Sequence, residues 1–127
     1  MEKHVIHTAK APNPVGPYSQ ALLANNLLFV SGQIGIDPAT GQIADNDIRS
    51  ETLQVMKNVE EILAAANMTF LNVVKCTIFI TNMDDFAAVN EVYGQFFLEN
   101  PPARETVEVS RLPKNARVEI SCIAAML

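Results

Sequence analysis

At 127 residues, with 49% apolar and 18% charged residues, the chain has the length of one domain (residues 1–127) with a single core and the composition of an ordinary globular protein. Its net charge of −5 at pH 7 argues against a general phosphate-binding surface, so nucleic acid is a poor candidate for a partner. No apolar run reaches the length of a membrane span and the N-terminus lacks a signal-peptide pattern, so we expect a cytoplasmic protein.

The N-terminal third predicts short strands separated by turns. Residues 2–8 alternate enough for a short strand, and the proline-rich stretch APNPVGPYSQ predicts an ordered but irregular loop. Residues 27–36 are β-rich and contain two glycines, which predicts a buried strand with Gly32 as a bulge or a point of close approach. The stretch DPATGQ is typical of a turn.

The middle of the chain predicts two helices around a strand. A helical stripe runs from residue 48 to about 67 and consists of Ile48, Val55, Met56, Val59, Ile62, Leu63 and Ala66. Residues 73–82 are β-branched and predict a strand, after which Asn82 or Asp84 could cap a second helix. That helix is expected to end near Leu98 and to bury Phe86, Val89, Tyr93, Phe96 and Phe97.

Two further strands, residues 103–109 and 117–125, are predicted on either side of the polar turn LPKN. The resulting order, β β β α β α β β, predicts an α+β fold with both helices on one face of a mixed sheet. Such a sheet leaves a second face and its edges uncovered, and oligomerisation would cover them.

Strand alternation separates the charged residues of these last two strands. Arg104 and Thr106 share one face, whereas Glu105 projects to the other, so Glu105 need not neutralise Arg104. In the last strand Glu119 is expected to share a face with Arg117. An arginine on a rigid strand offers a planar fork of donors that suits a carboxylate. Glu119 could be its ion-pair partner or an acid/base, and spacing alone leaves both open.

The same residues have ordinary structural interpretations. Arg104 and Glu119 could form a cross-strand ion pair on a solvated face. Tyr18 could be a partly buried ring whose hydroxyl finds a partner, and Ser31 a hydroxyl at a strand end.

No sequence pattern supports a nucleophilic triad, a phosphate loop or a metal site. No serine lies in G-x-S-x-G, and the glycines do not form a phosphate-binding motif. His4 and His7 are expected at the surface. Cys76 and Cys122 lie in apolar runs outside any C-x-x-C or metal-ligand spacing, so we expect buried free thiols.

Five segments spread over nearly the whole chain resemble the RidA (YjgF) family of enamine/imine deaminases. They are GPYSQA at residues 16–21, FVSGQI at 29–34, NVEEIL at 58–63, FAAVNEVYGQFF at 86–97, and PPAR..VEV.RLPK...VEI at 101–120. The Pro-Ala-Arg segment followed by Val-Glu-Ile is the signature of that family.

The resemblance implies a chorismate-mutase-like fold and a homotrimer with sites in clefts between subunits. It also implies a 2-iminobutanoate/2-iminopropanoate deaminase, which hydrolyses reactive 2-enamine and 2-imine acids such as 2-aminoacrylate and 2-aminocrotonate. The products are 2-oxo acids and ammonia, and neither a metal nor another cofactor is expected. An imine carbon is already electrophilic, so an anchored carboxylate and a held water suffice.

Carried over residue by residue, the resemblance implies that Arg104 binds the substrate carboxylate and that Glu119 positions and activates the attacking water. The other residues that it places in the pocket are Tyr18, Ser31, Gly32, Asn90 and Thr106. Gly32 and Thr106 are expected to act through backbone groups, and Asn90 in a supporting role.

Two positions depart from the family pattern. Glu105 stands where a small residue is common, which puts trimer packing or substrate preference in question. Thr106 stands where many members have cysteine, and it keeps the backbone groups. The main alternative function is a trimer that binds 2-oxo acids as a sensor or regulator without turnover, which would need Arg104 but not Glu119. The nucleolytic activity attached to some members ranks third, because the chain is acidic and lacks a basic stripe with interleaved aromatic residues.

Overall fold

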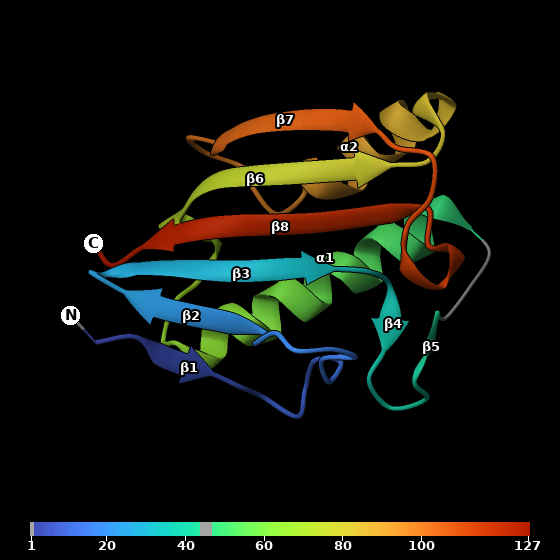
Figure 1. Cartoon of the computed structure of the whole chain (residues 1–127). Helices are drawn as coiled ribbons and strands as arrows, with labels where there is room; N and C mark the ends of the chain where they lie inside the picture. The colour runs from blue at the N-terminus through green and yellow to red at the C-terminus, as the bar shows by residue number, and fades with distance from the viewer. Residues whose placement is uncertain (1, 44–46) are drawn as a thin grey trace.

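The structure, a computed structural model, describes residues 2–43 and 47–127 and has one large sheet with two helices against it (Figure 1). The strands of the large sheet are β1 (His4–Ile6), β2 (Ala21–Ala24), β3 (Leu27–Gln33), β6 (Val73–Ile80), β7 (Ala103–Glu108) and β8 (Val118–Ala125). The helices are α1 (Ile48–Ala65) and α2 (Phe86–Gly94). The predicted order of strands and helices in this sheet is confirmed.

Smaller elements connect these. A hairpin of β4 (Ile36–Asp37) and β5 (Gln42–Ile43) forms where only the DPATGQ turn was predicted. Three 3₁₀ turns follow later in the chain: η1 (Phe70–Asn72), η2 (Met83–Asp85) and η3 (Pro113–Asn115). Asn82 caps η2 by accepting a hydrogen bond from the backbone N–H of Asp84, so the predicted cap precedes α2 by one turn.

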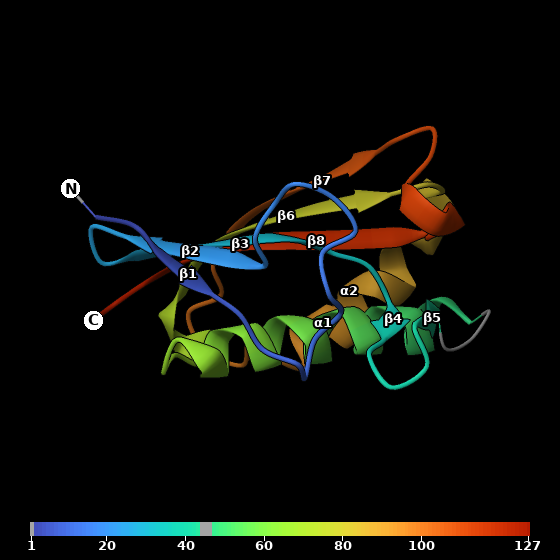
Figure 2. The ribbon, with the colours of Figure 1, turned by 60° about the horizontal axis from the view of Figure 1, so that its bottom comes forward.

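The strand order in the large sheet is β1-β2-β3-β8-β6-β7. All neighbouring strands are antiparallel except β6 and β7, which are parallel and are joined through α2, as a parallel pair requires. Both helices lie on the same face of this sheet (Figure 2), which confirms the predicted layering. We call the other side the open face.

The core lies between α1, α2 and the sheet. The predicted apolar stripe of α1 is buried, with Val55, Met56, Val59, Ile62 and Leu63 each no more than 2% exposed. In β8 alternate residues are buried against the helices, namely Val118, Ile120, Cys122 and Ala124. Cys76 and Cys122 are free and buried, as predicted. Neither helix of the described segments is long and apolar enough to cross a membrane.

The second helix is shorter than predicted, because α2 ends at Gly94 and not near Leu98. The backbone N–H groups of Phe96 and Phe97 bond to carbonyls three residues earlier, which is turn rather than α-helical geometry. Both rings contact Phe70 of η1, with centroids 5.2 and 5.3 Å away. Aromatic packing on a distant segment therefore ends the helix, and no helical periodicity could reveal it.

Candidate functional site

A pocket of about 370 Å³ lies beside the end of β3. Its walls come from the loop between β1 and β2, from residues 31–36, from η3 and from one side chain of β8. Four of the seven predicted site residues line it: Tyr18, Ser31, Gly32 and Glu119.

Glu119 approaches Gly32 so closely that any side chain at position 32 would displace the Glu119 carboxylate. A Cβ atom built on Gly32 would lie 2.6 Å from Cδ of Glu119. The pairing of β3 with β8 also shifts register between Val30 and Gln33, so Gly32 is both the predicted bulge and the predicted point of close approach. This geometry lets the Glu119 carboxylate lie against the β3 backbone inside the pocket.

The Glu119 carboxylate is partly buried and has no hydrogen-bonding or ionic partner among residues 2–43 and 47–127. Burial therefore raises the pKa of Glu119 above the usual value for a glutamate. A carboxylate in this condition is a suitable general base, because its pKa is shifted toward neutrality.

The loop of residues 11–20 is held in place by Gln20, which is 1% exposed. Its amide oxygen accepts from the N–H of Thr8, and its amide nitrogen donates to the carbonyls of Thr8, Ala11 and Pro12. These bonds replace the backbone pairing that a proline-rich segment cannot form. They fix the pocket wall formed by the loop.

Two pocket hydroxyls are also anchored to this loop. Ser31 Oγ donates to the carbonyl of Ser19 at 2.6 Å, and the phenol oxygen of Tyr18 accepts from the N–H of Val15 at 3.2 Å. Tyr18 lines the pocket while remaining 48% exposed. Ser31 and Tyr18 can therefore line a bound molecule without large rearrangement.

Arg104 lies on β7 against three side chains of α2. Its Nη1 donates to Asn90 Oδ1 at 2.7 Å, and its Cζ lies 5.0 Å from the Tyr93 ring centroid and 5.8 Å from that of Phe86. Phe86, Asn90 and Tyr93 are spaced by four and three residues, so one helix face presents all of them. Phe86, predicted to be buried, is 37% exposed because it covers the guanidinium at the molecular edge. This arrangement holds the guanidinium in a fixed orientation.

Thr106, two residues after Arg104, points to the same side of β7. Its hydroxyl oxygen is buried and lacks a hydrogen-bond partner within the described segments. An unpaired buried hydroxyl is costly unless something bonds to it. Arg104, Asn90 and Thr106 thus form a second polar group of predicted site residues, separate from the pocket.

Arg104 and Glu119 point to opposite faces of the sheet. Arg104 pairs with Cys76 on β6, whereas Glu119 pairs with Phe79 on the same strand. Cys76 and Phe79 are three residues apart, an odd number, so the faces differ, and the offset along the strands is about 10 Å. One chain therefore does not bring the two residues together, and the interpretation as an Arg104–Glu119 ion pair is wrong.

Glu105 projects to the open face, as alternation predicted. Its Oε1 lies 3.0 Å from the Lys75 ammonium nitrogen, and its Oε2 accepts from the Thr77 hydroxyl at 2.9 Å. The hydrogen bond from Lys75 lowers the pKa of Glu105. Glu105 therefore stays charged without neutralising Arg104.

Several residues that position or line the site were missed by sequence reasoning: Gln20, Gln33, Phe86, Tyr93 and Lys114. The sequence predicts the LPKN turn only as a connection between strands, yet Lys114 lines the pocket. The helical spacing of Phe86, Asn90 and Tyr93 is a usable signal for a shared face. Gln20 and Gln33 lie in the family-like segments GPYSQA and FVSGQI, but no local pattern indicates their contacts. In the described segments, no group of three His, Cys, Asp or Glu side chains is arranged to hold a metal ion.

Comparisons with known proteins agree over nearly the whole chain. The family model described as "Endoribonuclease L-PSP" matches residues 8–126. A RutC family protein of Pyrococcus horikoshii is 52% identical over 122 residues, which cover 96% of this chain and 97% of that protein. The human 2-iminobutanoate/2-iminopropanoate deaminase is 48% identical over 122 residues, covering 96% of this chain and 89% of that protein. The crystal structure of YyfA from Yersinia pestis, described as a member of the conserved Rid protein family, superimposes with a TM-score of 0.96 at 49% identity. That match covers 98% of this chain and 100% of the other.

Proposed function

The chain belongs to the RidA/YjgF family, and from this premise we propose that it hydrolyses 2-enamine and 2-imine acids to 2-oxo acids and ammonia. The observation that carries the proposal is the partly buried, unpaired carboxylate of Glu119 in a pocket. A protein that only bound a 2-oxo acid would have no use for a raised-pKa carboxylate beside its ligand. Glu119 therefore favours turnover over sensing.

We place each active site between two subunits of a homotrimer. The pocket with Tyr18, Ser31, Gly32 and Glu119 would come from one subunit, and Arg104, Asn90 and Thr106 from its neighbour. This division is supported by the opposite faces that Arg104 and Glu119 occupy within one chain. It is also supported by Thr106, whose buried hydroxyl has no protein partner within the described residues of its own chain.

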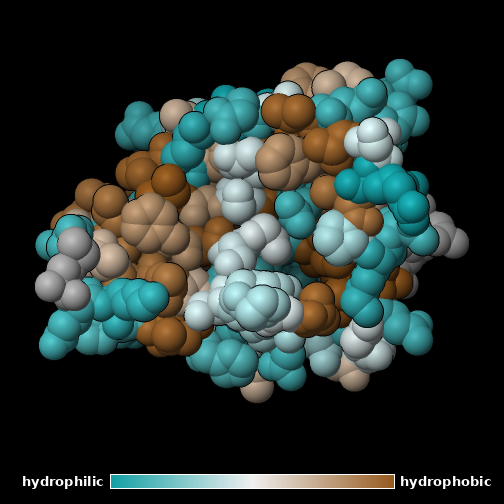
Figure 3. All heavy atoms as spheres, viewed as in Figure 1, coloured by the Kyte–Doolittle hydropathy of each residue, from teal (hydrophilic) through white to brown (hydrophobic). Residues whose placement is uncertain are grey.

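The open face of the sheet supports assembly. Cross-strand pairing places Val5, Leu22, Phe29 and Ile123 in one row across it, and Phe79 with Val107 in another. Val5, Phe29 and Val107 are 63%, 44% and 43% exposed. Figure 3 shows apolar surface over much of this face, broken by polar groups. An apolar sheet face of this kind suits contact with other subunits.

The residue types fit the reaction. The guanidinium of Arg104 would bind the substrate carboxylate through two parallel hydrogen bonds. Glu119 would take a proton from water as the oxygen bonds to the C=N carbon and the C=N π bond breaks, and would pass that proton to the nitrogen. It would then take the remaining proton from the new hydroxyl group and transfer it to the nitrogen as well. The C–N bond breaks, ammonia leaves, and a 2-oxo acid remains. A single positioned acid/base of this kind typically contributes about 10²–10⁴-fold to the rate.

Variants of Arg104 test the proposal directly. Arg104→Ala should lose measurable ammonia release from 2-aminoacrylate generated by a coupled dehydratase, while the assembly and the melting temperature stay close to wild type. Arg104→Lys keeps the charge but not the two-pronged geometry, so we expect KM to rise about tenfold or more, in line with loss of a charge-assisted hydrogen bond.

Each result of this assay has one meaning. Near-wild-type activity of Arg104→Ala would show that the carboxylate is bound elsewhere. A wild-type protein that binds 2-oxo acids through Arg104 but releases no ammonia would be the sensing trimer instead.

A further inference from the structure

Besides Thr52, whose hydroxyl donates to the carbonyl of Ile48 within the helix, two polar side chains of α1 are buried. Glu51 is 2% exposed and Asn58 is 1% exposed. They are seven residues apart, which is two helical turns, so they point the same way. Burying a carboxylate and an amide is unfavourable unless hydrogen bonds compensate, so their partners indicate what they do.

Asn58 holds the turn of residues 34–36, which forms part of the pocket wall. Its Nδ2 donates to the carbonyl of Ile34 at 3.1 Å and to that of Ile36 at 2.9 Å. Its Oδ1 accepts from Nε2 of Gln54 at 2.9 Å, which fixes the amide orientation. Ile34 and Ile36 both line the pocket.

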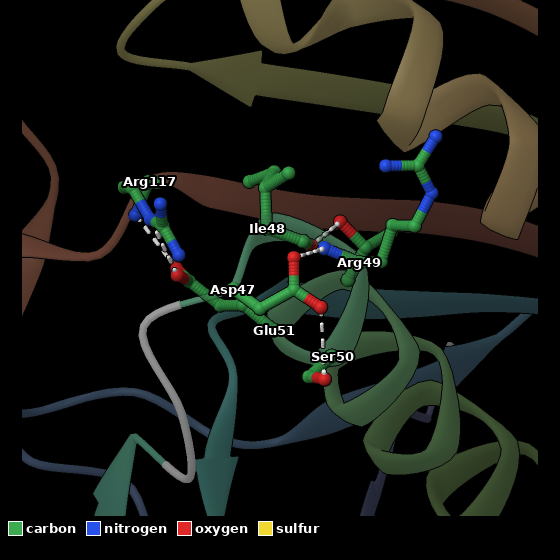
Figure 4. Close-up of polar contacts among 7 residues, drawn as sticks. Asp47, Ile48, Arg49, Ser50, Glu51 and Arg117 are labelled. Atoms are coloured by element: carbon green, nitrogen blue, oxygen red, sulfur yellow. Dashed lines mark hydrogen bonds and ion pairs between the residues drawn. The ribbon is translucent and has the colours of Figure 1, made fainter.

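Glu51 bonds Arg117, the residue directly before β8, which is the strand that supplies Glu119 to the pocket. Glu51 Oε2 accepts from the backbone N–H of Arg117 at 2.7 Å, and Glu51 Oε1 accepts from Arg117 Nε at 3.0 Å (Figure 4). The Arg117 carbonyl in turn accepts from the N–H of Thr81 at 3.1 Å. Arg117 was predicted to begin the strand and to share a face with Glu119, but β8 begins at Val118 and the Arg117 side chain reaches α1 instead. Glu119 is two residues further along.

Gly35 fits tightly between these two contacts. A Cβ atom on Gly35 would lie 2.8 Å from Cγ and 2.9 Å from the carbonyl oxygen of Glu51. The turn therefore packs directly on the helix backbone beside Glu51, while Asn58 bonds the carbonyls on either side of the glycine. Glu51 and Asn58 thus link both pocket segments to one rigid helix.

From these contacts we infer that Glu51 and Asn58 are positioning residues for the deaminase pocket: they hold the wall at residues 34–36 and the start of β8, and so fix where the Glu119 carboxylate stands. This inference rests on the proposed function for its kinetic consequences. The structural part of the inference, that α1 sets the position of Glu119, is independent of the proposed function.

The main test is a graded series at position 51. Glu51→Met keeps a side chain of similar length but removes both acceptor oxygens. Glu51→Gln keeps one acceptor oxygen. We expect Glu51→Met to lower kcat about 10- to 100-fold, because small misplacements of a reacting group cost this much. KM should stay within about twofold, since the substrate carboxylate is bound by Arg104 elsewhere. Glu51→Gln should recover part of the lost kcat.

Glu60→Met is the matched control, because Glu60 lies exposed on the same helix and makes none of these contacts. It should leave kcat and KM unchanged. Asn58→Asp is the second variant, and it decides the question if Glu51→Met does not fold. It replaces both N–H donors with a carboxylate facing two carbonyl oxygens, so kcat should fall while KM again changes little.

A purely stabilising role would give a lower melting temperature with an unchanged kcat per folded site, and that result would overturn the inference. Crystal structures of wild type and of whichever variant folds, Glu51→Met or Asn58→Asp, supply a readout that does not need activity. The Glu119 carboxylate should leave its place against Gly32 in the variant; an unmoved carboxylate would overturn the inference. If the wild type releases no ammonia, the proposed function fails, and these structures alone decide the role of Glu51 and Asn58.

Discussion

The proposed catalytic role of Glu119 comes with a cost to the stability of the fold, and replacing Glu119 separates the two effects. Because burial raises the pKa of Glu119, the base form is lost as pH falls through that raised value, and kcat should fall with it. Glu119→Gln should lower kcat about 10²–10⁴-fold and leave 2-oxo acid affinity nearly unchanged. Stopped-flow or coupled ammonia assays with calorimetric titration of a 2-oxo acid would measure both.

The same substitution should raise the melting temperature at neutral pH. A carboxyl with a raised pKa in the folded state contributes stability that is complete below its unfolded pKa and is lost as pH rises through the folded value. Above that value Glu119→Gln should therefore melt higher than wild type, and the difference should vanish on acidification. A glutamine variant that melts lower than wild type at neutral pH would contradict the unpaired state of the carboxylate.

At the level of single residues, alternation along a strand was a dependable guide. It correctly separated Glu105 from Arg104, and the glycine in a β-rich run correctly located the bulge at Gly32. Alternation failed at Arg117, because that residue precedes β8 and its side chain bonds Glu51 of α1, 66 positions earlier in the chain. Long-range partners such as Glu51 leave no local signal.

Among the helices and strands, α1 begins directly after a residue whose side chain caps it, whereas α2 has no side-chain cap. Asp47 caps α1 by accepting from the N–H of Arg49 and from the Ser50 hydroxyl, and the backbone bond from Arg49 lowers the pKa of Asp47. Asp47→Ala should therefore lower the melting temperature at neutral pH, because the first-turn N–H groups lose their acceptor. A carboxyl whose pKa is lower in the folded than in the unfolded state stabilises the fold at pH values above its unfolded pKa. This stabilisation is lost as pH falls through its folded pKa.

The melting-temperature difference between wild type and Asp47→Ala should shrink on acidification. Asp47→Asn is the control, because it keeps an acceptor oxygen that does not titrate, so its difference from Asp47→Ala should persist at low pH. A difference between wild type and Asp47→Ala that is independent of pH would exclude the charged cap as its cause. Differential scanning fluorimetry across acidic pH measures all three proteins.

Elements with strong periodicity were predicted well, and elements ended by tertiary contacts were not. The stripe of α1 located that helix within two residues of its observed end at Ala65. The end of α2 was misplaced because Phe96 and Phe97 turn toward Phe70. The β4–β5 hairpin was missed, since two-residue strands carry no readable alternation.

For the whole molecule, the proposed division of the active site between subunits of a homotrimer makes a testable prediction. Arg104→Ala and Glu119→Gln assemblies should each show little or no activity. Trimers reassembled from an equal mixture should recover activity, because about a quarter of the sites would pair an intact Arg104 of one subunit with an intact Glu119 of its neighbour. Ammonia release before and after mixing, with light scattering to follow assembly, measures this.

Failure to recover activity in verified mixed trimers would overturn the proposal that Arg104 of one subunit and Glu119 of its neighbour share a site. Unmixed samples carried through the same dissociation and reassembly serve as controls.

The arrangement of the strands could be predicted only in part. Composition and element order indicated an α+β layer structure, and both helices do lie on one face. The insertion of β8 between β3 and β6, and the parallel pairing of β6 with β7, join segments far apart in the sequence. Local patterns do not encode such pairings, so the separation of Arg104 from Glu119 became visible only once the register was known.

That separation has a consequence for how the protein works at low abundance. If the arginine of each chain serves one reaction centre and its glutamate another, an isolated folded chain is chemically silent. Specific activity would then decline on dilution below the concentration at which subunits associate, instead of staying constant per molecule. In a cell with two versions of the gene, one damaged chain would impair two centres at once.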